Sequence, residues 1–292
     1  MSAGRPVKKL PEETIVVSSE PTSELYKQIA LQSGASVHRL RITKGSDGAL
    51  VPNDTGMLVQ TTGLRQQSTI YVKDLGPQIR WRTVFLVEYL GPILIHPAFY
   101  SFFTKNGEGA SYTQTLTLIL VVTHFLKREL ETLFIHRFSA STMPTSNIFK
   151  NSAHYWLLSG VNMAFWIYRQ SFYGKSGPSP IVTSLGLALF VLGELGNLST
   201  HLTLRGLRSS GGKERGIPQG LGFDWVTCPN YMFEVVAWLG VALVSLNWST
   251  VLFAIVATGQ MGVWAKKKEA RYRKEFGGTY KRKRYAILPG IW

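Results

Sequence analysis

A group of ionisable side chains interrupts an apolar run that is long enough to cross a membrane. The run covers residues 114–135, and its polar members toward the end are His124, Lys127, Arg128, Glu129 and Glu131. A charge at the centre of a lipid-facing helix costs roughly 2.5–3.5 kcal/mol, so this block does not face acyl chains. The charges therefore either face a polar cavity or mark where the helix leaves the bilayer. A polar cavity would indicate a membrane enzyme or a transporter.

A second candidate site joins a basic, glycine-rich segment to the start of another apolar run. Arg205 and Arg208 open this segment, and it continues into Cys228-Pro-Asn-Tyr-Met-Phe-Glu234. Arginine side chains and open backbone amides suit phosphate groups. Pro229 can fix the first turn of a helix, in which Asn230 and Glu234 share one face. With Tyr231 they predict a polar pocket at the membrane rim, although an interfacial aromatic belt gives the same pattern.

A third candidate continues the last apolar run as a basic helix over residues 264–276. Lys268 and Tyr272 are four residues apart and so share a helical face. A basic extension of this kind, including Arg271, is more typical of contact with anionic lipid headgroups.

Composition excludes several other sites. No glycine-rich dinucleotide motif follows a strand, no Walker loop occurs, and the six histidines are scattered, so we predict no metal site. Cys228 is the only cysteine, which rules out a disulfide within the chain. The net charge of +15 would suggest nucleic acid in a soluble protein. Here much of the charge lies in loops and in the tail, so we predict lipid contact and no nucleic-acid partner.

Six apolar segments of about the length that a bilayer needs follow residue 80. They cover about 82–103, 114–134, 152–169, 180–203, 231–246 and 248–265, and the last two meet in a tight turn at Asn247-Trp248. With the N-terminus in the cytosol, the cytosolic loops and tail hold sixteen Lys and Arg residues, against three on the opposite side. This bias predicts an even number of spans with both termini cytosolic.

The polar N-terminal part predicts a small α/β domain over residues 1–78. Strands are expected at 14–18, 37–43 and 68–74, and a helix is expected from Ser23, as its N-cap, to Gly34. This order resembles a ubiquitin-like fold, for which packing or docking is the expected role. The predicted architecture is therefore an all-α polytopic membrane domain over residues 79–292, with about six transmembrane helices and a basic cytosolic tail, preceded by this head.

Four motifs together resemble the very-long-chain trans-2-enoyl-CoA reductases of the steroid 5α-reductase superfamily. They are Lys127–Phe138, Thr142-Met-Pro-x-x-Asn147-Ile-Phe-Lys-Asn, Cys228-Pro-Asn-Tyr-x-x-Glu234 and Trp264-Ala-Lys. The resemblance covers nearly the whole chain, including Lys73-Asp-Leu-Gly76. It implies an enzyme of the endoplasmic reticulum membrane that uses NADPH to reduce the 2,3 double bond of a long-chain trans-2-enoyl-CoA. This is the last step of fatty-acid elongation, so the resemblance also implies partners among the other elongation enzymes: the condensing enzyme, the ketoacyl reductase and the dehydratase.

The resemblance also implies roles for individual residues. The important Lys-Arg pair of the enoyl reductases matches Lys127-Arg128, their important tyrosine matches Tyr231, and a glutamate of the steroid reductases matches Glu88. A steroid-reductase tyrosine aligns with Phe125, which lacks the hydroxyl, and one of their aspartates appears as His201. The positions that match cofactor contacts are Asn197, Arg205, Arg208, Asn230, Glu234, Lys268 and Tyr272.

Reduction of a conjugated thioester needs a hydride at Cβ, a proton at Cα and stabilisation of the carbonyl oxygen. We expect Tyr231 to donate the proton, and Lys127 or Arg128 to hold either the enolate oxygen or a cofactor phosphate. Two other function classes stay open. One is a membrane enone or sterol reductase of the same superfamily, and the other is a non-enzymatic scaffold that docks through its head.

Overall fold

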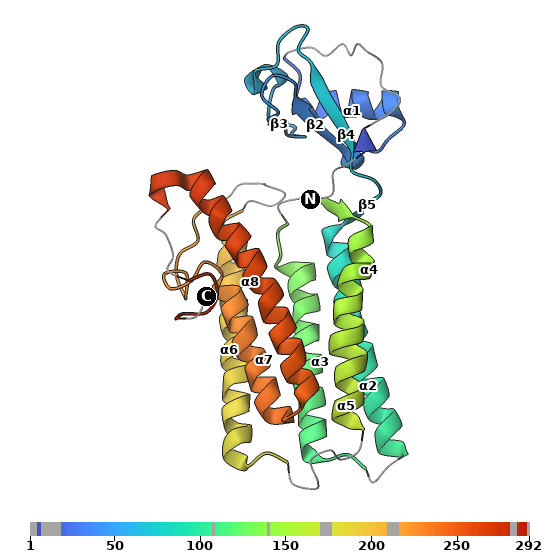
Figure 1. The fold of residues 1–292 in the computed structure, drawn as a ribbon, viewed down its shortest axis with the longest axis vertical. Coiled ribbons are helices and arrows are strands. Elements are labelled where there is room, and N and C mark those ends of the chain that lie inside the picture. Colours follow the sequence, from blue (N-terminus) through green and yellow to red (C-terminus); the bar gives the residue numbers. More distant parts are fainter. Residues whose placement is uncertain are drawn as a thin grey trace. The chain divides into compact units, whose positions relative to one another are not determined.

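The computed structural model describes residues 5–6, 19–106, 109–138, 141–169, 177–208, 216–280 and 285–290. The chain divides into two compact units (Figure 1). One unit combines Met1–Arg80 with Thr142–Asn147, and the other combines Trp81–Ser141 with Ile148–Trp292.

The smaller unit contains an antiparallel sheet of four strands in the order β1-β4-β2-β3. These strands are β1 (Arg5–Pro6), β2 (Leu40–Lys44), β3 (Leu50–Val51) and β4 (Ile70–Asp74). Its helical elements are α1 (Thr22–Ser33) and the 3₁₀ turns η1 (Val37–Arg39) and η2 (Val59–Thr62). A second antiparallel pair joins β5 (Gln78–Arg80) to β6 (Thr142–Pro144).

Apolar residues of α1 pack on one face of this sheet. Ile29, Ile42 and Val51 are almost completely buried. The buried Tyr26 hydroxyl donates to the Val51 carbonyl at 2.7 Å and accepts from the Ile42 amide at 3.2 Å. The phenol therefore joins α1 to two strands while its ring fills the core.

The local predictions for this unit are partly right. Gly34 ends α1 in the left-handed conformation, with φ 64°, where glycine is favoured. Ser23 is not the N-cap, because the helix already begins at Thr22 and Ser23 is buried in its first turn. The strand predicted from residue 37 begins at Leu40, since Val37–Arg39 form η1. The strand predicted at 14–18 lies outside the described residues.

The larger unit is helical. It contains α2 (Trp81–Lys105), α3 (Tyr112–Phe134), most of α4 (Ser146–Ser152), the π-helical segment η3 (Ala153–Asn162), α5 (Met163–Tyr168), α6 (Pro180–Gly206), α7 (Pro229–Ser245), α8 (Trp248–Phe276) and η4 (Gly277–Thr279). Every apolar segment predicted from the sequence therefore falls on a helix. Among the described residues, three helical stretches are long and apolar enough to cross a membrane: Trp81–Lys105, Pro180–Gly206 and Trp248–Thr279.

Small residues bring α6 and α7 into close contact. A Cβ atom on Gly193 would lie 2.4 Å from the Ala237 nitrogen, and one on Gly240 would lie 2.5 Å from the Gly186 carbonyl oxygen. Larger side chains would force the helices apart. Packing through small residues is typical of helices that associate in a bilayer, where apolar burial gives little driving force.

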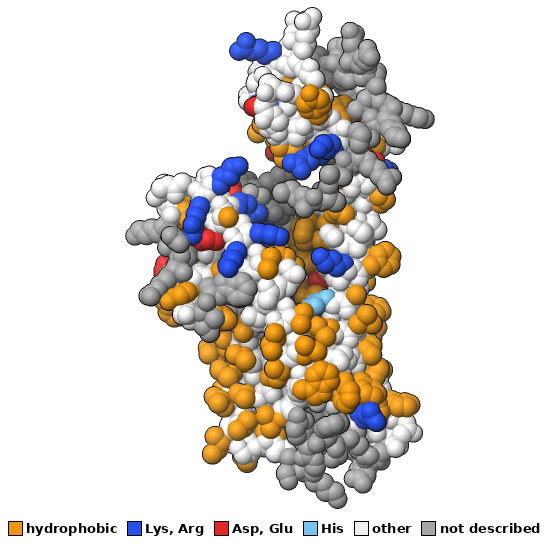
Figure 2. All heavy atoms as spheres, viewed as in Figure 1, with side chains coloured by type: hydrophobic (Ala, Val, Ile, Leu, Met, Phe, Trp, Pro, Cys, Tyr) orange, Lys and Arg blue, Asp and Glu red, His pale blue; other side chains and the backbone are white. Residues whose placement is uncertain are grey.

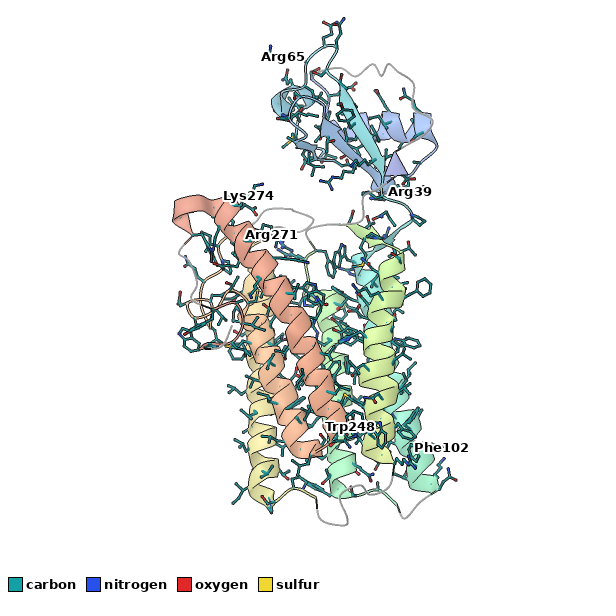
Figure 3. All side chains as sticks on the ribbon, viewed as in Figure 1. Arg39, Arg65, Phe102, Trp248, Arg271 and Lys274 are labelled. Carbon is teal, nitrogen blue, oxygen red and sulfur yellow. The ribbon has the colours of Figure 1, made fainter. Side chains whose placement is uncertain are left out.

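The two ends of the helical unit differ in composition. Figure 2 shows hydrophobic side chains over much of the visible surface of the bundle, with most of its visible Lys and Arg side chains toward one end. In Figure 3, Arg271 and Lys274 lie toward this end of α8, whereas Trp248 and Phe102 lie toward the other end of the bundle. The predicted turn at Asn247 is confirmed, because α7 ends at Ser245 and the Asn247 side chain caps α8.

Candidate active site

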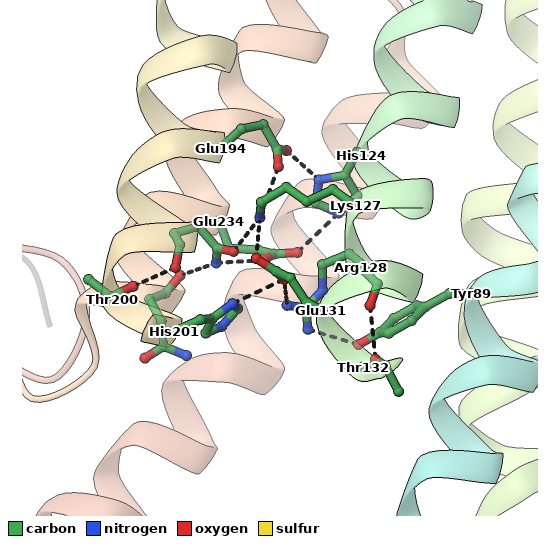
Figure 4. Close-up of polar contacts among 12 residues, drawn as sticks. Tyr89, His124, Lys127, Arg128, Glu131, Thr132, Glu194, Thr200, His201 and Glu234 are labelled. Atoms are coloured by element: carbon green, nitrogen blue, oxygen red, sulfur yellow. Dashed lines mark hydrogen bonds and ion pairs between the residues drawn. The ribbon is translucent and has the colours of Figure 1, made fainter. Parts of the chain in front are cut away.

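His124, Lys127, Arg128 and Glu131 of α3 point into the helical bundle, whereas Glu129 is half-exposed. Glu131 is 1% exposed and His124 is 3% exposed, and the side chains of Lys127 and Arg128 are mostly buried. Their partners lie on α2, α6 and α7, as Figure 4 shows. These four side chains therefore form a buried polar network between helices.

His124 joins α3 to two other helices. Its Nδ1 lies 2.5 Å from Glu194 Oε1 on α6, and its Nε2 lies 3.2 Å from Glu234 Oε1 on α7. Both ring nitrogens face carboxylate oxygens, an arrangement that suits an imidazolium because both of its nitrogens donate. In that form His124, with Lys127 and Arg128, would balance the charges of Glu131, Glu194 and Glu234.

Lys127 lies inside this network. Its Nζ donates a hydrogen bond to Asn197 Oδ1 at 2.7 Å and forms ion pairs with Glu131 Oε1 at 3.0 Å and Glu194 Oε2 at 3.1 Å. Two carboxylates therefore compensate the charge of this ammonium group inside the bundle, and Lys127 does not line the cavity described below.

Arg128 divides its guanidinium between two neighbours. Nη1 donates to Glu131 Oε2 at 2.9 Å, and Nη2 donates to the Tyr89 hydroxyl at 2.8 Å. His201 Nδ1 also lies 3.0 Å from Glu131 Oε2. Unlike Lys127, Arg128 also lines a cavity.

This cavity has a volume of about 250 Å³. Seven of the predicted site residues line it: Arg128, Arg205, Arg208, Asn230, Tyr231, Lys268 and Tyr272. Other residues of its wall are Phe85, His136, Arg137, His201 and Arg271. The concentration of guanidinium and ammonium groups makes the wall suitable for a ligand with several phosphates.

Two arginines of the cavity wall form hydrogen bonds between the segments that follow α3 and α6. Arg137 donates to the Arg208 carbonyl, and Arg208 donates to the Arg137 carbonyl. Arg137 also reaches the Arg205 carbonyl at 3.3 Å. These side-chain contacts satisfy carbonyls near the C-terminal end of α6.

Four predicted site residues do not line the cavity: Glu88, Lys127, Asn197 and Glu234. Asn197 contacts a residue of the cavity wall without lining the cavity itself. Its Nδ2 donates to the carbonyl of the wall residue Asn230 at 2.9 Å and to Glu234 Oε2 at 3.0 Å. Asn197 and Glu234 thus position Asn230 at the start of α7. Pro229 is the first residue of that helix, as predicted.

The interpretation of residues 264–276 as a lipid-binding face was incomplete. Lys268, Arg271 and Tyr272 line the cavity, and the Lys268 ammonium lies 5.5 Å from the centre of the Tyr272 ring. Helical spacing had placed Lys268 and Tyr272 on one face. It could not show that this face turns toward α6 and α7.

Three possible metal ligands come together although their histidines are far apart in the sequence. The ligand atoms of Glu131, His136 and His201 all lie within 4.8 Å of one another. Glu131, however, already pairs with Lys127 and Arg128. Because these two cations compensate its charge, we assign no metal to this cluster.

Four residues of this site have no specific role predicted from the sequence: Tyr89, His124, Arg137 and Glu194. Glu194 had a signal that could have been used, since it lies inside an apolar run, as the α3 charge block does. Tyr89 had none, because a tyrosine in a membrane-length helix is an ordinary core residue.

Comparison with known proteins shows similarity over the whole chain. Residues 141–292 match the family described as 3-oxo-5-alpha-steroid 4-dehydrogenase. A Schizosaccharomyces pombe protein whose name contains the words enoyl reductase is 41% identical over 295 residues, which cover 99% of this chain and 97% of that protein.

Two further relatives have more specific names. The very-long-chain enoyl-CoA reductase of Dictyostelium discoideum is 37% identical over 282 residues, covering 93% of this chain and 92% of its own length. A Caenorhabditis elegans protein whose name also contains the words very-long-chain enoyl-CoA reductase is 38% identical over 238 residues, covering 77% of this chain and 76% of its own length.

Proposed function

Since this chain belongs to the steroid 5α-reductase family, we propose that it is an NADPH-dependent reductase of the 2,3 double bond of very-long-chain trans-2-enoyl-CoA. The substrate class rests on the names of the Dictyostelium and Caenorhabditis relatives. One observation about the site carries the proposal: Arg128 and Tyr231 line the same cavity, whose wall is otherwise rich in cations. An anionic cofactor and a reducible carbonyl compound both suit such a wall.

The residues present fit NADPH. Arg205, Arg208 and Lys268 supply positive charge for its phosphates, together with Arg137 and Arg271. Asn230 and Tyr272 supply neutral hydrogen-bonding groups on the same wall. Asn197 and Glu234 do not contact the cofactor in this proposal. They hold Asn230 in place through the hydrogen bonds of the Asn197 amide. When bound, NADPH supplies the hydride that the reaction needs.

The protein's own groups then provide the acid and the electrostatic stabilisation. Tyr231 donates a proton to Cα of the substrate, the role for which a phenol in the cavity wall is suited. Arg128 stabilises the negative charge that develops on the thioester oxygen. Lys127 does not touch the substrate in this proposal, because it does not line the cavity and its ammonium group pairs with Glu131 and Glu194.

The membrane arrangement is part of the same proposal. We infer six spans, formed by α2, α3, the helix over η3 and α5, α6, α7 and α8, with both termini in the cytosol. This is supported by the predicted apolar segments, all of which are helical, and by Arg271 and Lys274 at the end of the bundle opposite Trp248. The enzyme would belong to the endoplasmic reticulum, with residues 79–292 as the reductase domain.

Residues 1–78 would form the cytosolic ubiquitin-like head. The antiparallel sheet packed on α1 supports this assignment. In our proposal the condensing enzyme, the ketoacyl reductase and the dehydratase of fatty-acid elongation are the partners, because they produce this substrate in sequence.

The deciding experiment follows NADPH oxidation by the full-length protein in detergent with a chain-length series of trans-2-enoyl-CoAs. We expect turnover that rises with acyl length, and little turnover with an enone steroid. Preference for the steroid would favour a sterol reductase, to which the family description also points. Failure to bind NADPH would reject both enzymes in favour of a membrane scaffold.

A further inference from the structure

Arg128 and Tyr89 join α3 to α2, and Glu88 precedes Tyr89 in α2. Arg128 Nη2 donates to the Tyr89 hydroxyl at 2.8 Å. The Arg128 guanidinium carbon also lies 5.1 Å from the centre of the Tyr89 ring. A phenol can accept one hydrogen bond and donate another, so a Tyr89 hydroxyl that accepts from Arg128 keeps its own hydrogen for a second partner.

Glu88 is buried away from the cavity. The residue is 2% exposed, and it does not line the cavity. Among the described residues, its Oε2 has no hydrogen-bond partner. A buried carboxyl group with an unsatisfied oxygen is unfavourable for stability, which indicates a role other than packing.

Of Glu88, Tyr89 and Arg128, it is Arg128 that lines the cavity. Its two arms are held by Glu131 on one side and by the Tyr89 hydroxyl on the other. A guanidinium held at both ends keeps one orientation, whereas one held at a single end can rotate toward other acceptors. The Tyr89 contact therefore determines how the cation faces the cavity.

We propose that Tyr89 is a positioning residue for Arg128, and that Glu88 acts on the reaction through Tyr89 rather than by contacting the substrate. This inference rests on the proposed function of the cavity. It assigns a role to Tyr89 and replaces the direct carbonyl contact expected for Glu88. Its main consequence is that the effects of Glu88 and Tyr89 depend on each other.

Tyr155 provides a matched control. Tyr89 and Tyr155 are neighbouring aromatic residues, with ring centres 5.2 Å apart, and both pack against Phe125. Arg128 donates to the hydroxyl of Tyr89. Removing either hydroxyl changes the core by one oxygen atom, but the Tyr89 substitution also removes a hydrogen bond from Arg128.

The test is a double-mutant cycle on the full-length enzyme, with kcat, KM for enoyl-CoA and Kd for NADPH measured separately. Tyr89→Phe should lower kcat by about 10- to 100-fold, as for a lost hydrogen bond to a charged group, with little change in Kd for NADPH. Glu88→Leu should give a similar decrease, and Glu88→Gln, which keeps an acceptor for Tyr89, should lower kcat much less. Tyr155→Phe should remain close to wild type.

The double variant Tyr89→Phe with Glu88→Leu gives the decisive result. If Glu88 acts through Tyr89, kcat of the double variant stays within about threefold of that of Tyr89→Phe alone, because residues that act as a unit are non-additive. Multiplication of the two single effects would show an independent role for Glu88 and overturn the inference. Wild-type turnover by Tyr89→Phe, or equal losses in Tyr89→Phe and Tyr155→Phe, would also overturn it.

The inference and the proposed function fail in different ways. Absence of NADPH-dependent enoyl-CoA reduction by the wild-type protein would reject the proposed function. A fully active wild type with an equally active Tyr89→Phe variant would reject the inference alone. If Glu88→Leu does not fold, Glu88→Gln replaces it in the cycle, and an effect that persists undiminished in the Tyr89→Phe background counts against the inference.

Discussion

Lys127 and Glu194 form a buried ion pair between α3 and α6, with Nζ 3.1 Å from Oε2. The other oxygen of the same carboxylate lies 2.5 Å from His124 Nδ1, so Glu194 faces two basic side chains of α3. The side chains of Lys127 and Glu194 are 18% and 10% exposed. This pair explains why a lysine in a membrane-length helix need not face a ligand.

Lys127 is therefore expected to matter first for stability. Lys127→Ala leaves Glu194 and Glu131 short of a counter-charge and should lower the free energy of unfolding by about 3–5 kcal/mol, the usual result of breaking a buried pair. Thermal unfolding in detergent measures this, with the exposed Lys105→Ala as the control for loss of charge. A stable Lys127→Ala protein that binds NADPH normally but has lost turnover would instead indicate direct catalysis by Lys127.

Tyr231→Phe separates chemistry from binding. Loss of the proposed general acid should lower kcat by roughly 10²–10⁴-fold. NADPH affinity should change little, because the cationic side chains of the cavity remain. Single-turnover NADPH oxidation measures the effect, and Tyr112→Phe is the control because Tyr112 is 72% exposed at the start of α3. Near-normal turnover would place the proton donor elsewhere.

The sequence predicted the location of helices better than the contacts between them. Each predicted apolar run of bilayer length falls on a helix, because hydropathy is a local property. His124 and Glu194 meet although seventy positions separate them, and no local pattern specifies which helix α3 packs against. Lys268 and Arg271 were placed on the correct helix, but the direction of their face depends on the rotation of α8.

In the smaller unit, the sequence predicted some element boundaries correctly and others incorrectly. Gly34 was recognised as the end of α1 because a left-handed residue favours glycine. The predicted N-cap was two residues too late, because Pro21 is the N-cap and Ser23, although it has cap chemistry, is buried in the first turn. The two-residue strand β3 was missed because so short a run has no alternation to detect.

Metal removal should leave the enzyme active. Glu131, His136 and His201 have the side chains of a metal site, yet Lys127 and Arg128 neutralise the carboxylate. Turnover after treatment with EDTA and 1,10-phenanthroline should match that of the untreated protein. Loss of activity that zinc restores would show that the cluster holds a metal.

The smaller unit should become less stable in acid through Asp74. Hydrogen bonds from the Arg39 guanidinium hold the pKa of Asp74 below its usual value. A lowered carboxyl pKa stabilises the fold above the unfolded pKa, about 3.9, and this contribution is lost as the pH falls through the lower folded value. Hydrogen exchange of β2 and β4, corrected for intrinsic rates, should therefore accelerate in acid. Asp74→Asn should weaken this pH dependence, and an unchanged profile would contradict the assignment.

Arg271 and Lys274 test which face of α8 binds the cofactor. Both are cations near the end of the same helix (Figure 3), but Arg271 lines the cavity and Lys274 does not. Arg271→Ala should weaken NADPH binding by about 10-fold or more, as expected for a lost charged hydrogen bond, whereas Lys274→Ala should have little effect. The Arg271 contribution should also decrease as salt is added, because screening weakens contacts with phosphate. Equal, small losses in both variants, measured by NADPH titration, would mean that α8 contributes general positive charge near anionic lipid rather than a cofactor contact.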